Sequence, residues 1–479
     1  MIVRGQARAD GARTCLLAFL LLALPLGLWF AVMTPLGDVA DEPAHLMRAA
    51  ALLDGAIVGH RETITLPDGR PVAAAGILVD PVWEAMSRSR DPVDVSRVAV
   101  PAPDPISGTG PWGTERRFHA LYTIGTYFPA FYAPAALGLA AGRIVGATPR
   151  QAATLGRLAA LLTYAILACA ALALTRRGRL LLFVTLALPM SLSLAGSFNH
   201  DGLIIATSAL AAALLTRVRT GDAGARLRHP AYGFAAISIA LVVLAKPPYA
   251  PLALALLLPL TRLGLLARAA IVLLAVLPGI LWAGFTMATV ATPVPRTAYE
   301  AGPLWPGLRP ATFQSTDPKA QLNVLAAAPA RLLTLPAGYL FTIKHMIWLA
   351  RTGIGCLGWL DRPIPALIYG LWPLAFFGAL QAGGRARAGL RREGLLLLMA
   401  GLACLWAILL SQYLTWTNVG ESRIDGPQGR YLLPLLPLIV PLLAADEAAS
   451  PTRWRRAVGW LPYLAAGAGL TLIPALMQF

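Results

Sequence analysis

The chain alternates between long apolar stretches and short polar segments. Eleven of the apolar stretches are long enough, or nearly so, to cross the roughly 30 Å hydrocarbon layer of a bilayer as helices. The pattern therefore predicts an all-α polytopic membrane protein with about eleven transmembrane helices, built as a single membrane domain over residues 1–479. The predicted crossings are residues 14–36, 154–175, 179–197, 201–217, 231–246, 248–262, 269–290, 364–381, 394–415, 431–446 and 457–476.

Two further apolar stretches, residues 119–146 and 329–350, are ambiguous by hydropathy alone. Each contains prolines and basic side chains, which suit helices at the membrane interface better than lipid-facing spans. We therefore expect juxtamembrane helices rather than crossings. They fall within two large loops on the same face, residues 37–153 and 291–363.

Arginine-rich clusters occupy five of the short loops between apolar stretches. Short basic loops stay on the cytoplasmic side, so the clusters predict which side each loop faces. The N-terminus, with arginines ahead of an uncleaved first span, starts on that side, and the two large loops face the other. The clusters are residues 176–179, 217–228, 262–268, 385–392 and 453–456.

Composition and charge agree with a membrane protein. Hydrophobic residues make up 57% of the chain and charged residues only 13%, which excludes an ordinary soluble globule. The formal net charge is +17, but much of the excess lies in loops that flank apolar spans, where topology and anionic headgroups account for it. No nucleic-acid partner is therefore expected. The four cysteines show no paired spacing, so neither a disulfide framework nor a zinc site is indicated.

A first acidic motif directly follows the first span. Asp41, His45 and Arg48 recur at helical spacing, which places a carboxylate, an imidazole and a guanidinium on one face. Asp41 or Glu42 could simply cap this helix. Capping does not explain three acids within residues 38–42 together with His45 and Arg48 at the membrane surface. We therefore favour a functional role, with Asp41, Glu42 and His45 as catalytic candidates.

A second acidic site lies in the turn Asn199-His200-Asp201, between two apolar helices on the same face. Asn199 or Asp201 alone would be interpreted as a helix N-cap. Opposite the first motif, Asp201 becomes a candidate second carboxylate. Asp41 and Asp201 could share a divalent cation, magnesium or manganese, or one could act as a base while the other orients the substrate. The sequence leaves these alternatives open.

Basic and aromatic side chains gather on the same face. Lys246 and Tyr431 could be snorkelling and aromatic-belt anchors. This interpretation is weaker for Arg430, because glycines and a proline in residues 426–429 shape a specific turn at the start of a helix, where an anion is favoured. The candidates for binding a phosphate are Arg430, Lys246, Lys344, Arg351, Tyr431 and Gln428. For the stretch that carries Lys344 and Arg351, a solvated helix on the membrane surface is an equal alternative.

The assembled motifs resemble those of a bacterial family of polytopic membrane proteins, domain of unknown function 2142, regarded as relatives of the GT-C type glycosyltransferases. The resemblance implies a GT-C-like fold whose first outer loop covers a cavity at the membrane surface, and a catalytic base at Asp41. The sequence departs from the two-acid pattern of some GT-C enzymes, since His200 stands beside Asp201. The matching segments are Asp41-Glu42-Pro43-x-His45, residues 127–143, Asn199-x-Asp201, Gly358-Trp359-Leu360-Asp361, and Gln428-Gly429-Arg430-Tyr431 followed by Pro434.

These observations lead to an expected function. A site away from the cytoplasm has no supply of nucleotide sugars, so a sugar donor would arrive on a polyprenyl phosphate and pass its sugar to a glycan or lipid acceptor, beside membrane lipids. The expected location is the bacterial inner membrane, with the site in the periplasm. A flippase for a lipid-linked saccharide and a non-catalytic partner in envelope polysaccharide assembly remain alternatives.

Overall fold

The computed structural model describes residues 2–65, 69–87, 110, 112–219, 228–295, 315–382, 391–444 and 452–477. In these ranges the protein is mainly helical, and six helical stretches are long and apolar enough to cross a membrane. They are built from α1 (Ile2–Ala18) continuing through η1 (Phe19–Ala23) into α2 (Leu24–Met33), α6 (Pro149–Leu174), α9 (Asp201–Arg219), α11 (Leu265–Thr289), α16 (Arg391–Thr415), and α18 (Arg453–Val458) with α19 (Leu461–Leu476).

The other five predicted crossings are occupied by shorter elements. Prolines interrupt several of them, because proline removes a backbone donor and clashes with the preceding turn. Pro189 separates two short helices, and Pro251 and Pro441 lie inside others. Within the described residues, length and composition support six crossings, or seven if the bent stretch of residues 331–354 counts as one span, and the predicted eleven are not confirmed. The shorter elements are α7 (Arg179–Leu186) with α8 (Pro189–Ala195), α10 (Arg228–Ala245), η5 (Pro247–Leu257), α15 (Ala366–Ala382), and η7 (Gly429–Leu432) with α17 (Leu435–Leu443).

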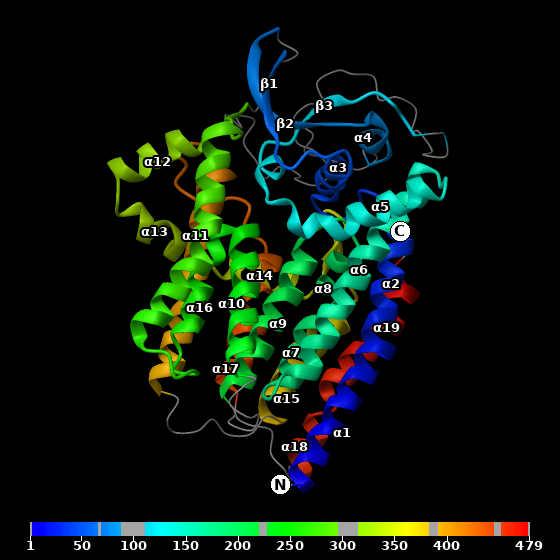
Figure 1. Ribbon diagram of the computed structural model, residues 1–479, viewed down its shortest axis with the longest axis vertical. Helices are drawn as coiled ribbons and strands as arrows, with labels where there is room; N and C mark the ends of the chain where they lie inside the picture. Colours follow the sequence, from blue (N-terminus) through cyan, green and yellow to red (C-terminus); the bar gives the residue numbers. More distant parts are fainter. Residues whose placement is uncertain are drawn as a thin grey trace.

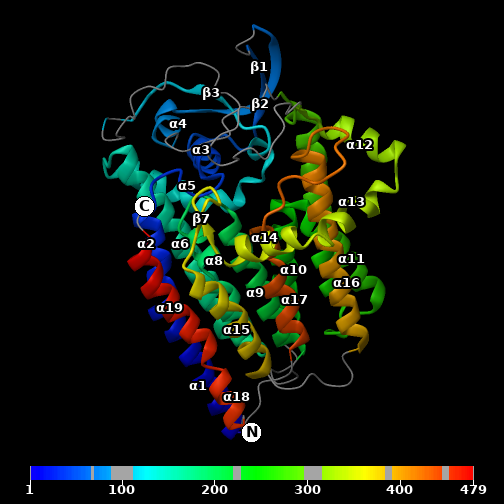
Figure 2. The same ribbon diagram turned by 180° about the vertical axis from the view of Figure 1, so that it is seen from behind.

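The two ambiguous apolar stretches do not form straight spans. The first holds η3 (Ile124–Thr126), η4 (Pro129–Tyr132) and α5 (Ala133–Ile144), and the 12 residues of α5 reach only about 18 Å at 1.5 Å per residue. The second forms α13 (Arg331–Leu340) and α14 (Ile343–Ile354), which meet at a bend of 71°. Such a bend indicates a broken span or a re-entrant segment. In Figure 2, α14 lies across the direction of the long helices.

A small mixed layer sits on one end of the bundle (Figure 1). The all-α prediction missed its antiparallel sheet, in which His60 pairs with Gly76 and Ile77 with His119. Residues 88–109 of this loop lie outside the described residues. The layer contains α3 (Glu42–Leu53), α4 (Pro81–Ser87), β1 (His60–Thr65), β2 (Pro71–Val79) and β3 (Arg117–Ala120). Nearby lie α12 (Pro318–Ala327) and two short hairpins, β4 (Val294–Pro295) with β5 (Ser315–Thr316), and β6 (Cys356–Leu357) with β7 (Arg362–Pro363).

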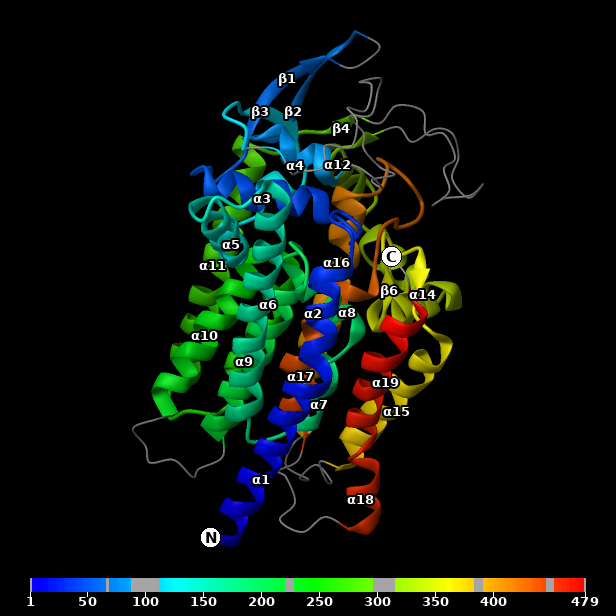
Figure 3. The ribbon, with the colours of Figure 1, turned by 90° about the vertical axis from the view of Figure 1, so that its right-hand side faces the viewer.

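The three arginine clusters that the structure describes, residues 176–179, 262–268 and 453–456, lie at the opposite end of the bundle from this layer. The N-terminus, the α6–α7 junction and α18 are all at that end (Figures 1 and 3). Residues 262–268 precede and begin α11 there. Most of residues 217–228 and 385–392 lie outside the described residues, but the helix ends that flank both clusters are at the same end. The predicted separation of basic loops from acidic motifs is therefore present among the described residues.

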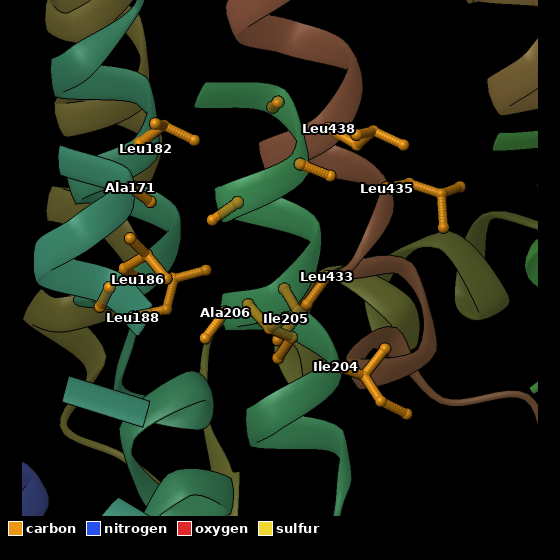
Figure 4. Close-up of a cluster of buried hydrophobic side chains, with 14 of the residues drawn as sticks. Ala171, Leu182, Leu186, Leu188, Ile204, Ile205, Ala206, Leu433, Leu435 and Leu438 are labelled. Carbon is orange, nitrogen blue, oxygen red and sulfur yellow. The ribbon is translucent and has the colours of Figure 1, made fainter. Parts of the chain in front are cut away.

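The hydrophobic core brings distant helices side by side near the site. Figure 4 shows Ile204 and Ile205 of α9 beside Leu433 and Leu435, where η7 leads into α17, with α7 on the other side. These side chains are all buried and belong to one continuous cluster. Because α9 begins with Asp201 and η7 contains Arg430, this packing places the start of α9 beside η7 and brings Asp201 near Arg430.

Candidate functional site

Asp41 occupies an unusual backbone position at the start of α3. Its φ of 66° lies in the left-handed region, which costs most residues energy but which aspartate and asparagine adopt more readily. The residue stands at the N-cap position, yet its side chain makes no capping hydrogen bond to α3. Capping therefore does not account for this acid. Its side chain is 36% exposed.

A hairpin from the second large loop holds the segment that carries Asp41. The backbone N–H of Ala40 donates to the carbonyl oxygen of Gly358 at 3.1 Å. Trp359 Nε1 donates to the carbonyl oxygen of Gly37 at 3.0 Å, and Arg362 forms an ion pair of 3.1 Å with Asp38. The motif of residues 358–361 thus serves to position the first acidic loop.

Arg430 reaches the same loop from the far end of the sequence. Its side chain is 1% exposed, and it forms an ion pair with Asp41. Its Nη1 donates to the carbonyl oxygen of Ala40 at 3.0 Å, and its Nε lies 3.9 Å from Asp201 Oδ2. The first acidic motif and the turn that carries Arg430, predicted to lie on the same face, are in direct contact in the structure.

The turn that carries Arg430 depends on close packing against α14. The N–H of Gly429 donates to the hydroxyl of Thr352 at 2.7 Å, and Trp348 Nε1 donates to the carbonyl oxygen of Pro427 at 2.9 Å. A side-chain carbon at Gly429 would lie 1.8 Å from the carbonyl oxygen of Leu349. Only glycine allows this approach, so the packing against α14 fixes the position of the turn that carries Arg430.

Asp201 forms the second carboxylate of the cluster. It is buried, with 3% of its side chain exposed, and it forms an ion pair with Lys246. The turn before it is held by Asn199, whose Oδ1 accepts from the N–H of Asp201 at 2.9 Å and whose Nδ2 donates to Ala40 at 3.2 Å. The ring of Tyr431 lies 5.0 Å from Lys246 Nζ, within the range of cation–π attraction.

A buried group of imidazole and phenol rings lies behind the two carboxylates. His45 Nδ1 is 2.6 Å from the hydroxyl of Tyr132, and the rings of His45 and His200 are 4.9 Å apart. His200 also stacks on Tyr127 at 5.0 Å. Burial lowers the pKa of His45 to about 3, against the opposing fields of Asp41 and Asp201. Both imidazoles are neutral near pH 7, since burial lowers the pKa of His200 as well.

Glu42 lies in a closed environment, in contrast to Asp41. Its side chain is fully buried, and Arg157 of α6 donates to both carboxylate oxygens, at 2.7 and 2.6 Å. The N–H groups of Gly37 and Phe198 donate to the same oxygens, at 3.0 and 3.2 Å. Arg157 also donates to the carbonyl oxygen of Thr34 at 2.6 Å. This arrangement ties the first span, α3 and α6 together.

The remaining phosphate-binding candidates are less centrally placed. Lys344 and Arg351 are exposed on α14, and no contact among the described residues joins either to Arg430 or Asp41. Arg351 interacts instead with Tyr369. Gln428 precedes η7, and its buried Oε1 accepts no hydrogen bond within the described part of the chain.

The residues as placed do not fit a resident divalent cation. Within the described ranges, no group of three or more His, Cys, Asp or Glu side chains is arranged to hold a metal ion. Asp41 and Asp201 both face Arg430, and Asp201 also holds Lys246. The carboxylates are therefore balanced by two side-chain cations.

Residues 24–439 match the model of a family described as predicted membrane protein (DUF2142). The chain belongs to the DUF2142 family. The matched residues include both acidic motifs, Arg430 and the buried ring cluster of His45, Tyr127, Tyr132 and His200. The resemblance to the DUF2142 family is therefore confirmed. No curated protein and no solved structure matches the DUF2142 chain significantly.

His45 was predicted from the sequence as a site residue, but Arg157, Tyr127 and Tyr132 were missed. A usable signal was present for Arg157, since an ionisable side chain inside an apolar span is paired or functional by default. Tyr127 and Tyr132 lie within residues 127–143, one of the segments that carry the family resemblance, but nothing in their spacing indicates that they surround His45 and His200. That arrangement depends on how η4 packs against α3.

Proposed function

We propose that this protein is a GT-C type glycosyltransferase, which moves a sugar from a polyprenyl-phosphate-linked donor to a glycan or lipid acceptor. The observation that carries the proposal is the Asp41–Arg430 pair. A partly exposed carboxylate meets a buried guanidinium at the end of the bundle opposite the arginine clusters. Acceptor activation and phosphate binding are the two tasks that such a transfer requires.

The proposal includes a topology. The six long helical stretches and the five shorter apolar elements would together make eleven crossings, with the arginine-rich end in the cytoplasm. In the inner membrane of a bacterium the Asp41 site would then face the periplasm. A lipid-linked donor follows from that location, because activated nucleotide sugars are confined to the cytoplasm.

The chemical step uses both members of the pair. The acceptor hydroxyl gives its proton to the carboxylate of Asp41 as its oxygen attacks the anomeric carbon. The bond from that carbon to the donor phosphate breaks, and its electron pair leaves on the phosphate oxygen. Arg430, with Lys246, stabilises that developing charge, and loss of one such preorganised donor typically lowers turnover about 10²–10³-fold. Direct attack inverts the anomeric centre.

The other candidates take supporting roles. Glu42 and Arg157 position the Asp41 loop, and the neutral rings of His45 and Tyr132 form its buried wall. Lys344 and Arg351, exposed on α14, would contact anionic lipid headgroups, where each basic side chain contributes about 1 kcal/mol near an anionic surface. Tyr431 and Gln428 frame the phosphate position.

The variant Asp41→Asn tests the function. Asparagine also tolerates the left-handed backbone, so the variant should fold and insert normally, while transfer falls at least about 10²-fold because the general base is lost. Mass spectrometry of lipid-linked saccharides and surface polymers, with and without the gene, would first identify donor and product. Turnover of the purified variant would then be compared with wild type.

Glu115→Gln is the matched control for Asp41→Asn. It removes one carboxylate on the same end of the molecule, where Glu115 is 73% exposed and pairs only loosely with Arg117 at 3.1 Å. Its turnover should equal wild type. Wild-type turnover in Asp41→Asn would reject Asp41 as the base.

A further inference from the structure

The charges of the site are already balanced without a ligand. Asp41 and Asp201 carry two negative charges, Arg430 and Lys246 carry two positive charges, and the two imidazoles are neutral. Arg430 holds Asp41 and lies 3.9 Å from Asp201, which holds Lys246. Within this group of four side chains, an incoming phosphate therefore meets no cation without a carboxylate partner, and it must displace a carboxylate to take its place on Arg430.

The two carboxylates differ in their freedom to move. Asp41 is 36% exposed, and its only hydrogen-bond partner among the described side chains is Arg430. Asp201 is 3% exposed and is enclosed by Lys246, His200 and Arg430. Turning Asp41 outward exposes a charge that water can solvate, whereas moving Asp201 would strand a buried charge. Asp41 is the carboxylate that can leave.

Two buried side chains, Arg430 and His200, have nitrogen atoms without a hydrogen-bond partner among the described residues. Arg430 Nε makes no hydrogen bond within the described part of the chain, although it lies 3.9 Å from Asp201 Oδ2. Neither ring nitrogen of His200 has a hydrogen-bond partner there, and its Nε2 lies 3.5 Å from Asp201 Oδ1. Buried polar groups are normally satisfied. Small shifts would let both Arg430 Nε and His200 Nε2 donate to the Asp201 carboxylate. Lys246 could then turn toward a ligand.

We propose that the Asp41–Arg430 ion pair is a latch, which the phosphate of the lipid-linked donor opens by replacing Asp41 on Arg430. Released from Arg430, the Asp41 carboxylate is free to accept the proton of the acceptor hydroxyl. The inference rests on the proposed function, and it adds an order of events. The donor binds first, and only the bound donor uncovers the base.

The same exchange governs the end of the cycle. Transfer leaves a proton on Asp41 and raises the negative charge of the lipid phosphate, so Asp41 does not compete for Arg430 at that moment. Once the exposed carboxyl loses its proton to water, it is again an anion. It can then return to Arg430 and help to expel the lipid phosphate.

The latch makes a prediction opposite to that of an ordinary binding residue. Full-length protein in lipid nanodiscs would be titrated with undecaprenyl monophosphate, the leaving group of the proposed transfer. Asp41→Asn should bind it more tightly than wild type, by about fivefold, the factor expected when one partly exposed competing ion pair is removed. Inorganic phosphate should show the same ratio at weaker absolute affinity, because the anion replaces Asp41 in either case.

Controls separate the latch from general charge effects. Glu115→Gln removes the same charge away from the site and should bind like wild type. Undecaprenol, which lacks the phosphate, should bind Asp41→Asn and wild type equally. Arg430→Ala should lose the phosphate-dependent part of the affinity, and a thermal unfolding curve would establish that this variant is folded.

Each outcome decides a different claim. Tighter binding by Asp41→Asn supports the latch. Equal or weaker binding by Asp41→Asn overturns the latch, while binding by wild type and its loss in Arg430→Ala would still support the proposed function. No phosphate-dependent binding to any folded variant would overturn the phosphate site, and both proposals with it.

Discussion

Two neighbouring acids, Asp41 and Glu42, each pair with an arginine from a distant helix, yet the two pairs have opposite properties. The side chains of Glu42 and Arg157 are 0% and 4% exposed, and both Glu42 oxygens accept from two donors. In the other pair Arg430 is buried, but Asp41 is 36% exposed. We call the buried Glu42–Arg157 pair the closed pair and the partly exposed Asp41–Arg430 pair the open pair.

The comparison shows that residue type does not determine the role of a charge. A buried carboxylate whose hydrogen bonds are all satisfied would lose far more than it gained by releasing its partner. A partly exposed carboxylate with one ion-pair partner, such as Asp41, can move into water at a small cost in free energy. We therefore infer that the Glu42–Arg157 pair stabilises the fold, and we propose that the Asp41–Arg430 pair takes part in the reaction.

The largest effect should come from breaking the closed pair. Arg157→Ala leaves Glu42 buried without its cation, a change that typically destabilises a protein by about 3–5 kcal/mol. Thermal unfolding of the purified protein, or its yield from membranes, would measure the loss. Arg143→Ala is the control, since Arg143 is 46% exposed and lies 3.6 Å from Asp54. If Arg157→Ala were as stable as this control, Glu42 would not have the structural role assigned to it.

A smaller effect concerns the buried imidazole behind the open pair. The pKa of His45 is lowered to about 3 from 6.5, so between these values the unfolded chain binds a proton that the folded protein does not. The free energy of unfolding should therefore fall as pH falls through this window, by up to about 1.4 kcal/mol per pH unit. The Tm should drop between about pH 7 and pH 5.

The variant His45→Gln should lose part of this pH dependence while keeping a polar side chain near Tyr132. His200, whose pKa is lowered in the same direction, would retain the rest. Equal slopes of Tm against pH in His45→Gln and wild type would contradict the burial of a neutral His45.

The smallest expected effect tests how the open pair is positioned. Trp359→Phe keeps an aromatic ring but removes the hydrogen bond from Nε1 to the carbonyl oxygen of Gly37, at a cost of about 1 kcal/mol in stability. If the hairpin positions Asp41, turnover should fall by a larger factor than the affinity for the phosphorylated lipid changes. An unchanged turnover, measured beside an unchanged Tm, would show that the hairpin is dispensable.

The sequence by itself determined the membrane character and the separation of the described arginine clusters from the acidic motifs. These properties are local, because the hydrophobic effect and the topology rule act on each segment with its own flanks. The sequence also indicated four of the charged side chains that meet in the structure, Asp41, Asp201, Lys246 and Arg430. Helix bounds were less well determined, since prolines shorten several predicted crossings. The sheet of the first loop was missed, because β3 has only four residues and β2 is a nearly continuous apolar run, which periodicity alone does not distinguish from a helical segment.

Only the tertiary structure decided which acid is closed and which is open. Glu42 and Arg157 are 115 positions apart, and Asp41 and Arg430 are 389 positions apart. Both acids are carboxylates in the same motif, and neither the propensity nor the charge of a residue specifies its partner. Partner choice and exposure follow from packing: α6 brings Arg157 under the loop, and α14 with the core around α9 brings Arg430 over it. Burial, which sets the cost of separating two charges, exists only once those helices meet.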